Sequence, residues 1–223
     1  MKPKNLRYPF PWQERRPLLV GQVFFIPEYY QDHDAAFLPP WEEIFGNTNP
    51  ILLEYCSGNG SWIIEKARAH PDQNFIAVEK KFERVQKIWS KMSNGGLKNL
   101  LIIAGEALVA SRCYFKTASI DAICVHFPDP WPKEKHAKNR LFQEPFVSEL
   151  ARIAKKGATL RAVTDDADYA GQILSAVVQS PSFTTAFPEP FYITDFPGYG
   201  TSYFEELWRS QGREIRYLEF LCQ

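Results

Sequence analysis

The chain has 223 residues, which is enough for one domain with a substantial core. Its 26 basic and 26 acidic residues balance, so no overall positive charge indicates a nucleic-acid partner, and only local clusters of charge can do so. The four cysteines form no Cys-x-x-Cys pair, and no apolar stretch near the start is long enough to span a bilayer. We therefore expect a cytoplasmic protein with no membrane segment and no metal site.

The first 40 residues are rich in proline and aromatic residues and show no clean hydrophobic period, so we expect a peripheral arm over a core formed by residues 41–223. Basic and aromatic residues are interleaved in this arm: Lys2, Lys4, Arg7, Tyr8, Phe10, Trp12, Arg15 and Arg16. Such a mixture favours contact with nucleic acid, although a frayed terminus with incidental charges would have the same composition.

Short apolar runs and helical periods alternate through the rest of the chain. Strands are expected at 51–55, 75–79, 100–104, 120–127, 158–164 and 214–221, with helices at 62–69, 82–89, 141–154 and 169–178. The segment 155–157 should end the helix that precedes it, because Lys-Lys-Gly is a typical C-terminal signal. This alternation predicts a single α/β domain with a mostly parallel sheet and helices on both faces.

Acidic and glycine residues follow the ends of these strands, where ligands bind to parallel sheets. They are Glu54, Gly58, Glu79, Glu106, Asp129 and Asp165. The first strand runs into Gly58 and Gly60, which let a backbone turn sharply beside a ligand. A plain strand-to-helix turn would look similar, but Glu79 lies about 20 residues further on, where a carboxylate can accept both ribose hydroxyls of a nucleoside.

The carboxylates also distinguish between cofactors. Glu106 can accept from an adenine amino group, and Glu54 lies just before the glycine loop. A diphosphate cofactor would be repelled by that extra carboxylate, whereas S-adenosylmethionine carries an ammonium and a sulfonium group. We therefore expect S-adenosylmethionine rather than NAD, held by Glu54, Gly58, Gly60, Glu79 and Glu106.

The fourth strand runs directly into Phe127-Pro128-Asp129-Pro130-Trp131. Two prolines fix the backbone around Asp129, and Trp131 offers a broad aromatic face. The basic residues Lys133, Lys135, His136, Lys138 and Arg140 follow. A fixed carboxylate, an aromatic ring and a basic tail suit a base attached to a phosphate backbone. The alternatives are a proline-rich turn braced by Trp131 and a solvated basic helix.

These motifs resemble the bacterial tRNA (guanine-N7-)-methyltransferases, which methylate the guanine at position 46 in the variable loop of tRNA. The matching residues are Glu54-x-x-x-Gly58-x-Gly60, Val78-Glu79, Pro128-Asp129-Pro130-Trp131-x-Lys133, Lys135-His136-x-Lys138-x-Arg140, Thr164-Asp165-x-x-x-Tyr169 and Thr201-x-Tyr203-x-Glu205. The resemblance covers roughly residues 40–223. It implies a Rossmann-like class I S-adenosylmethionine-dependent fold with a seven-stranded sheet.

The resemblance also implies roles for individual residues. Asp129 is the implied catalytic residue and touches both cofactor and guanine. A substrate pocket is implied for Lys133, Asp165, Thr201, Ser202, Tyr203 and Glu205, and contacts with the tRNA backbone for Lys135, His136, Lys138 and Arg140. Asp165 has a second interpretation as a helix N-cap, and the segment 201–205 as the start of a helix.

Three departures from the family pattern stand out. The loop reads Tyr55-Cys56-Ser57-Gly58 where Ile-Gly-x-Gly is usual, and we expect the serine in place of the first glycine either to stiffen the loop or to shift cofactor affinity. Glu106 replaces the usual aspartate. The segment after Thr201 is one residue longer than usual, so either Glu205 or Glu206 is the pocket carboxylate.

Two other functions remain open at this point. One is a methyltransferase of the same fold that acts on a protein or on an adenine amino group, and the other is a non-enzymatic RNA-binding module. The residues indicate neither the set of tRNAs, nor the oligomeric state, nor a need for a partner subunit.

Overall fold

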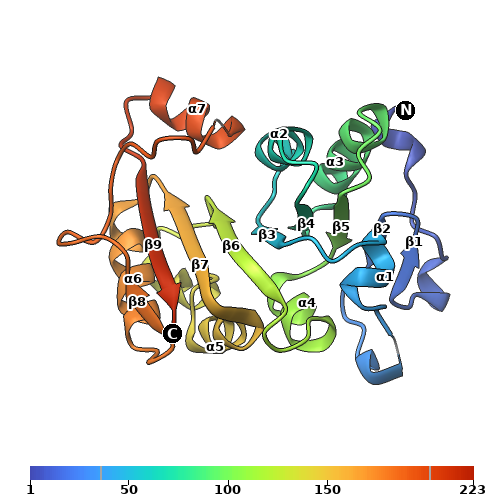
Figure 1. The fold of residues 1–223 in the computed structure, drawn as a ribbon, viewed down its shortest axis with the longest axis horizontal. Helices are drawn as coiled ribbons and strands as arrows, with labels where there is room; N and C mark the ends of the chain where they lie inside the picture. Colours follow the sequence, from blue (N-terminus) through green and yellow to red (C-terminus); the bar gives the residue numbers. More distant parts are fainter. Residues whose placement is uncertain (36, 201) are drawn as a thin grey trace. The chain divides into compact units, whose positions relative to one another are not determined.

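The computed structural model describes residues 1–35, 37–200 and 202–223, and the chain forms two compact units. Unit 1 comprises Met1–Phe115 and unit 2 comprises Lys116–Gln223 (Figure 1). Each unit has its own strands, helices and buried core.

The strands of unit 1 lie in the order β1-β2-β5-β4-β3. Their bounds are β1 (Leu18–Val20), β2 (Val23–Phe25), β3 (Ile51–Tyr55), β4 (Asn74–Glu79) and β5 (Leu100–Ala104). β1 and β2 form an antiparallel hairpin, whereas β2, β5, β4 and β3 run parallel. The register sets Tyr55 opposite Val78 and Glu79 opposite Ala104, so the carboxyl ends of β3, β4 and β5 meet at one edge.

Helices cover these strands and explain their apolar sequences. The helices of unit 1 are α1 (Trp41–Phe45), α2 (Ser61–Ala69), α3 (Phe82–Asn94) and α4 (Ala107–Tyr114), with short 3-10 turns η1 (Pro3–Asn5), η2 (Trp12–Glu14) and η3 (His33–Ala35). α2 and α3 pack together beside β4 and β5 (Figure 1). α3 buries Val85, Ile88 and Met92, which lie three and four residues apart on one face of the helix.

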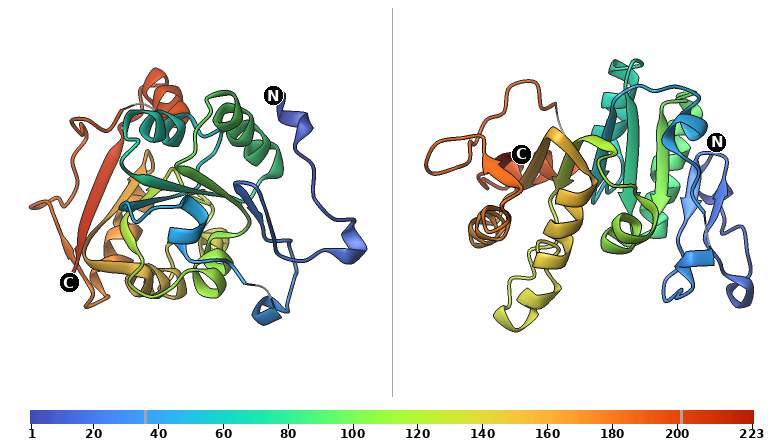
Figure 2. Two further views of the ribbon diagram at one scale, coloured as in Figure 1. Left: turned by 45° about the vertical axis from the view of Figure 1, so that its right-hand side comes forward. Right: turned by 60° about the horizontal axis from the view of Figure 1, so that its bottom comes forward.

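Unit 2 has the strand order β6-β7-β9-β8. Its elements are β6 (Ile120–His126), η4 (Glu134–Asn139), α5 (Glu144–Ile153), β7 (Ala154–Thr164), α6 (Ala167–Val178), β8 (Phe183–Thr185), α7 (Tyr203–Ser210) and β9 (Arg216–Cys222). β6 and β7 are parallel, and β9 is antiparallel to both β7 and β8. α5 and α6 pack together on the same side of the strands (Figure 2). α7 lies beyond the ends toward which β6 and β7 run (Figure 1).

α5 ends at Ile153, within one residue of the expected end, but the expected capping role of residues 155–157 is wrong. Residues 155–157 do not form a capping turn, because β7 begins at Ala154 directly after Ile153. The register of β7 against β6 jumps from Ile120–Ala154 to Ala122–Thr159, so the segment with Gly157 bulges out of the ladder. A bulge accommodates extra residues in one strand, and the φ angle of 80° at Gly157 suits it.

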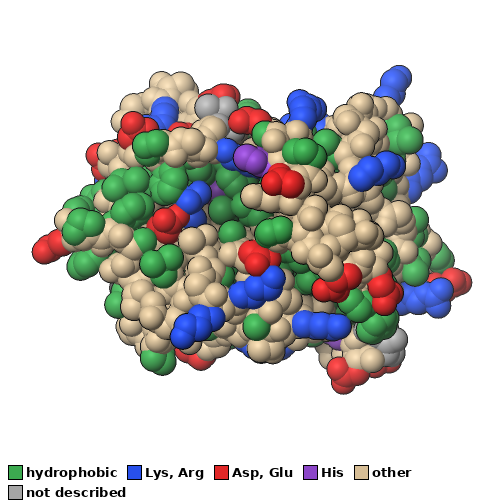
Figure 3. Space-filling model, viewed as in Figure 1, with side chains coloured by type: hydrophobic (Ala, Val, Ile, Leu, Met, Phe, Trp, Pro, Cys, Tyr) green, Lys and Arg blue, Asp and Glu red, His purple; other side chains and the backbone are tan. Residues whose placement is uncertain are grey.

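The predicted alternation of strands and helices is confirmed. Within the described residues the two units contain five and four strands, more than the seven that the resemblance implies. The additional strands are β1 and β2, which belong to the segment expected to be a peripheral arm, and β2 is fully buried. Among the described helices, none is long and apolar enough to cross a membrane. Acidic and basic side chains are interspersed over the face shown in Figure 3.

Candidate active site

The glycine loop of unit 1 is tied to Glu79. Glu79 is the last residue of β4, and its side chain is buried. Its Oε2 atom accepts a hydrogen bond from the backbone N–H of Gly58 at 2.8 Å, and its Oε1 atom accepts one from Lys81 N–H at 2.8 Å. Each carboxylate oxygen has a second lone pair, so two acceptor positions remain for a ligand. The structure thus brings together the two main parts of the predicted cofactor site.

Burial and the neighbouring groups shift the pKa of the Glu79 carboxyl in opposite directions. Burial raises the pKa of Glu79, while the amides of Lys81 and Gly58 and the guanidinium of Arg84 oppose the rise. Arg84 Nη1 lies 3.8 Å from Glu79 Oε2. Glu54, in β3, is also buried. Two buried carboxylates therefore lie in the last two residues of neighbouring parallel strands, in positions that the packing of an apolar core does not require.

Cys56, not Ser57, occupies the position of the first glycine of the loop. Cys56 has a φ angle of 59°, in the left-handed region that glycine favours, which corrects the expectation for the serine. Ser57 instead donates its hydroxyl to the carbonyl of Glu54 at 3.1 Å. Burial and the nearby Glu79 and Glu54 raise the pKa of the Cys56 thiol, so it stays protonated at neutral pH.

Gly60 is required by close packing at the start of α2. It has a φ angle of 73°, and a Cβ atom at this position would lie 2.8 Å from Cγ1 of Ile88 on α3. Any side chain here would push α2 away from α3. The short connection between β3 and α2 therefore depends on this glycine, as the strand–loop–helix pattern predicts.

Glu106 begins α4 and faces a small cavity. Its Oε2 atom accepts from the backbone N–H of Val109 at 2.9 Å, which caps the helix. Glu106 and Val109 line a cavity of about 180 Å³ together with Lys80, Pro27, Tyr30 and His33. The cavity adjoins the residue that follows Glu79, and a planar heterocycle fits its size. The other carboxylate oxygen of Glu106 is not used by the helix cap.

The turn after β6 holds Asp129 at the surface of unit 2. Phe127 and Trp131 have φ angles of 47° and 42°, which are unusual for bulky residues and mark a constrained turn. Asp129 is exposed, and its Oδ1 atom accepts from Trp131 N–H at 3.2 Å. The predicted constrained carboxylate is therefore present, with one oxygen directed to the turn.

The basic tail divides into two kinds of residue. Lys133, Lys135 and Lys138 are exposed, as a phosphate-binding role requires. His136 packs edge-on against Trp131, with 5.7 Å between ring centroids. Arg140 is instead an internal brace: its Nε donates to the carbonyl of Pro130 at 2.6 Å, and its Nη1 donates to Gln172 Oε1.

Asp165 and Asp166 have separate roles at the end of β7. Asp166, not Asp165, is the N-cap of α6, because its Oδ1 atom accepts from Tyr169 N–H at 2.7 Å. This corrects the helix-capping interpretation of Asp165. Asp165 forms an ion pair with Arg213, whose Nη1 lies 2.5 Å from Asp165 Oδ2.

The start of α7 favours Glu205 over Glu206 as the pocket carboxylate. Glu205 is 7% exposed, whereas Glu206 is exposed to solvent. Glu205 Oε1 accepts from Tyr217 Oη at 2.7 Å and from Arg209 Nε at 3.0 Å. Its Oε2 atom is buried and has no hydrogen-bond partner among the described residues.

The other predicted residues of this segment have simpler positions. Ser202 is the N-cap of α7 and its hydroxyl accepts from Glu205 N–H, so the interpretation as a helix start is confirmed. Tyr203 is exposed. Thr201 lies outside the described residues.

Sequence reasoning missed the residues that hold these carboxylates. Arg213 pairs with Asp165, and Tyr217 and Arg209 hold Glu205. Burial and the hydrogen bond to Glu205 raise the pKa of Tyr217, so the phenol remains a donor at neutral pH. Arg209 lies four residues after Glu205, a spacing that faces the same side of a helix and that could have been noticed in the sequence. Nothing local in the sequence indicates Tyr217 or Arg213.

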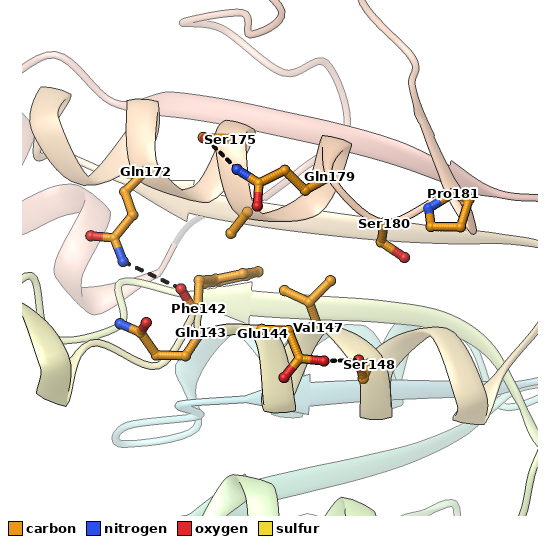
Figure 4. A pocket seen from close by; sticks show the side chains of 11 residues that line it. Phe142, Gln143, Glu144, Val147, Ser148, Gln172, Ser175, Gln179, Ser180 and Pro181 are labelled. Atoms are coloured by element: carbon orange, nitrogen blue, oxygen red, sulfur yellow. Dashed lines mark hydrogen bonds between the residues drawn. The ribbon is translucent and has the colours of Figure 1, made fainter.

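A separate cavity of about 590 Å³ opens between α5 and α6 (Figure 4). Glutamine and serine side chains line much of it, and several pair with each other: Gln179 with Ser175, and Ser148 with Glu144. None of the predicted site residues lines this cavity. It is therefore not part of the candidate active site.

Comparisons with known proteins agree with these motifs. A family model described as a putative methyltransferase matches residues 48–218. The tRNA (guanine-N(7)-)-methyltransferase of Chlamydia caviae is 45% identical over 221 residues, which cover 99% of this chain and 98% of the relative. The protein of the same name from Rubrobacter xylanophilus is 31% identical and covers 85% of both chains.

Solved structures agree on the fold. The 16S rRNA methyltransferase KamB has a TM-score of 0.63 at 16% identity, covering 93% of this chain and all of its own. A 16S rRNA (adenine(1408)-N(1))-methyltransferase variant from Catenulisporales acidiphilia, solved with its cosubstrate SAM, has a TM-score of 0.60 at 17% identity and covers 92% of this chain and 96% of its own. The predicted class I methyltransferase fold is thereby confirmed. From the full-length similarity and the matching motifs we conclude that the chain belongs to the tRNA (guanine-N(7)-)-methyltransferase family.

Proposed function

We propose that this protein transfers the methyl group of S-adenosylmethionine to N7 of the guanine at position 46, in the variable loop of tRNA. The observation that carries the proposal is the similarity to proteins named for this activity over 99% of the chain. The cytoplasm, where tRNA is modified in bacteria, is the expected compartment.

The residues of unit 1 fit S-adenosylmethionine. Glu79 keeps acceptor positions for two ribose hydroxyls while the amides of Gly58 and Lys81 hold it in place. Glu106 lines a cavity of about 180 Å³, where its carboxylate would accept from the adenine amino group. The negative charge of Glu54 favours the cationic methionine portion of the cofactor and disfavours a diphosphate.

The reaction requires alignment rather than a strong base. When bound, S-adenosylmethionine would supply an electrophilic methyl group, to which the in-plane lone pair of guanine N7 would donate while S-adenosylhomocysteine left. Guanine N7 has no proton to lose, and positive charge develops on the base. A preorganised carboxylate that accepts hydrogen bonds from the N1–H and N2–H donors stabilises that charge. Asp129 is the carboxylate that we assign to this role, because its turn is constrained and its side chain is exposed.

Other residues of unit 2 complete the substrate site in this proposal. The buried Oε2 atom of Glu205 offers a second acceptor for a guanine donor, and Asp165 contributes a further carboxylate. Lys133 contacts a phosphate or the base. Lys135 and Lys138, both exposed, bind the tRNA backbone.

The proposal is tested by incubating the purified protein with unmodified tRNA transcripts and S-adenosylmethionine labelled on its methyl group. The modified nucleoside is then identified by mass spectrometry and mapped by cleavage at 7-methylguanine. A transcript with adenine in place of the guanine at position 46 is the matched control. Label on an adenine amino group, on protein, or on the control transcript at the wild-type rate would contradict the proposal.

A further inference from the structure

The first residues of the chain are held along α3, although no role in methyl transfer is assigned to them. Ser90 Oγ donates to the carbonyl of Met1 at 2.6 Å, and Gln86 Nε2 donates to the carbonyl of Leu6 at 2.8 Å. The segment is therefore not a frayed terminus. These contacts place the interleaved aromatic and basic residues of the arm at a defined position in unit 1.

The aromatic residues of the arm line a cavity of about 160 Å³, which we call the arm pocket. Its walls are formed by Tyr8, Phe10 and Trp12 from the arm, by Phe82 at the start of α3, and by Pro27 and Gly105. The ring of Tyr8 stacks on that of Phe82, with centroids 4.0 Å apart and an angle of 18° between the planes. Aromatic rings therefore form much of the pocket wall, and its volume suits one aromatic heterocycle.

Large aromatic surfaces remain open to water around the arm pocket. Tyr8 is 52% exposed and Trp12 is 57% exposed. Aromatic rings usually bury most of their surface, and an exposed pair beside a cavity is typical of a stacking site for a flat ligand. The bases of single-stranded nucleic acid are recognised in this way, because every base has a π face.

Charged groups around the pocket suit a nucleotide. The guanidinium of Arg15 lies over the ring of Trp12, 4.4 Å from its centroid, and Arg7 and Arg16 are exposed nearby in sequence. Lys80 and Glu28 both line the pocket and lie 3.9 Å apart. Cations attract the phosphate backbone, and a carboxylate accepts from the amino or imino group of a base.

We propose that the arm pocket binds one unpaired nucleobase of the tRNA, other than the guanine that is methylated. This inference rests on the proposed function, because it assumes that tRNA is the substrate. The adenine of S-adenosylmethionine is the other planar ligand to consider. Glu106, the residue suited to its amino group, lines the neighbouring cavity of about 180 Å³ and not the arm pocket.

The test compares Trp12→Ala with Trp12→Phe and with Phe37→Ala, which removes an aromatic ring that is also exposed, at 74% against 57% for Trp12, and that does not line the pocket. The dissociation constant for an unmodified tRNA transcript is measured at fixed salt, and that for S-adenosylmethionine by calorimetry. Loss of one stacked base should weaken tRNA binding by about 5- to 150-fold in Trp12→Ala. Trp12→Phe should retain most of the affinity, Phe37→Ala should match the wild type, and all should bind the cofactor normally.

Abasic substitutions in the transcript identify the base. A tRNA that lacks the base which enters the arm pocket should bind wild type and Trp12→Ala with equal affinity. A double-mutant cycle should therefore show a coupling free energy between Trp12 and that base, and none between Trp12 and the other tested positions. Unchanged tRNA affinity in Trp12→Ala would overturn the proposal. Weaker cofactor binding with unchanged tRNA binding would also overturn it and assign the pocket to adenine. If the wild type methylates its tRNA while Trp12→Ala binds normally, only the arm pocket is refuted, whereas a wild type that neither binds nor methylates tRNA refutes the proposed function.

Discussion

Gly58 and Glu79 are joined by a hydrogen bond of 2.8 Å across 21 residues of sequence. The bond links the glycine loop after β3 to the carboxylate that ends β4. The same carboxylate thus shapes the loop and keeps lone pairs that we propose accept from a ribose. If that proposal holds, loop geometry and ribose recognition cannot be changed independently at this position.

We expect Glu79→Ala to weaken cofactor binding strongly. The variant loses acceptors for the ribose hydroxyls, each of which is worth about 1.5–3 kcal/mol as a charge-assisted hydrogen bond. Calorimetry with S-adenosylmethionine measures the effect, and Glu83→Ala, an exposed glutamate on the next helix, is the control. Wild-type affinity in Glu79→Ala would mean that the ribose binds elsewhere.

Cofactor affinity should fall as the pH is lowered, and the fall should begin at a higher pH than it would if Glu79 had the pKa of an ordinary glutamate. Burial raises the pKa of Glu79, and only the ionised carboxylate offers all of its acceptors. Affinity is therefore complete above this raised pKa and is lost as pH falls through it. Titrations of S-adenosylhomocysteine binding from about pH 8 to about pH 5 check the effect. Glu79→Gln should bind S-adenosylhomocysteine more weakly, and its affinity should depend less on pH. If the pH dependence is unchanged in that variant, another group is responsible for it.

Asp129→Ala should lose turnover far more than stability. Removing one preorganised electrostatic contact costs about 10²–10³ in rate. Asp129→Asn should recover little, since the amide keeps the shape and lacks the charge. Because Asp129 is exposed, the thermal midpoint should barely move. Single-turnover rates with saturating cofactor and tRNA isolate the chemical step. Asp168→Ala, an exposed aspartate on α6, is the control, and a near-normal rate in Asp129→Ala would reduce Asp129 to a turn residue.

The basic tail should separate into binding and bracing residues. Lys135→Ala with Lys138→Ala should weaken tRNA binding and reduce its salt dependence by roughly 0.7–0.9 log units of slope per lost phosphate contact. The paired control is Lys116→Ala with Lys156→Ala, which removes the same charge from other exposed sites. If both pairs behave alike, the tail acts only through net charge.

Arg140 differs from these two lysines, because its guanidinium is bonded within the protein. It supports the turn through Pro130 and Gln172, and its replacement should lower the thermal midpoint as well as tRNA affinity.

Glu205→Gln should impair methylation, whereas Glu206→Gln should not. Glu205 is buried and its Oε2 atom has no hydrogen-bond partner among the described residues, whereas Glu206 is exposed. Loss of a buried acceptor that serves the substrate costs about 1–3 kcal/mol, which should appear in kcat/KM for tRNA. Tyr217→Phe removes one donor that orients Glu205 and should give a smaller loss of the same kind. Equal effects of the two glutamine variants would rule out Glu205 as the pocket carboxylate.

Much of the strand pattern was predictable, because buried parallel strands read as short continuous apolar runs. Residues 75–79 and 100–104 are examples, and both lie in strands as expected. The carboxylates were also predictable, since they end such runs. The hairpin of β1 and β2 was not, because each strand has only three residues and neither shows a period.

The other features of the structure that the sequence did not predict depend on tertiary contacts and on local backbone geometry. Arg213 reaches Asp165 across 48 residues, and no local pattern encodes such a pair. The role of residues 155–157 was misjudged because Gly157 serves a bulge in β7, and glycine is equally suited to a bulge and to a helix end. Asp165 and Asp166 are adjacent, and only the backbone geometry decides which of them caps α6.

The pairing of β2 with β5 has a consequence for the solubility of the protein. β5 reads Leu-Leu-Ile-Ile-Ala and is fully buried, so without β2 it would present an apolar edge with unpaired backbone groups. Such an edge recruits strands from other molecules and promotes aggregation. The outermost strand is instead β1, which is three residues long and lies between Pro17 and Gly21, features that discourage further pairing. We therefore expect that a chain shortened to its alternating core would expose the apolar edge of β5 and aggregate more readily than the full chain.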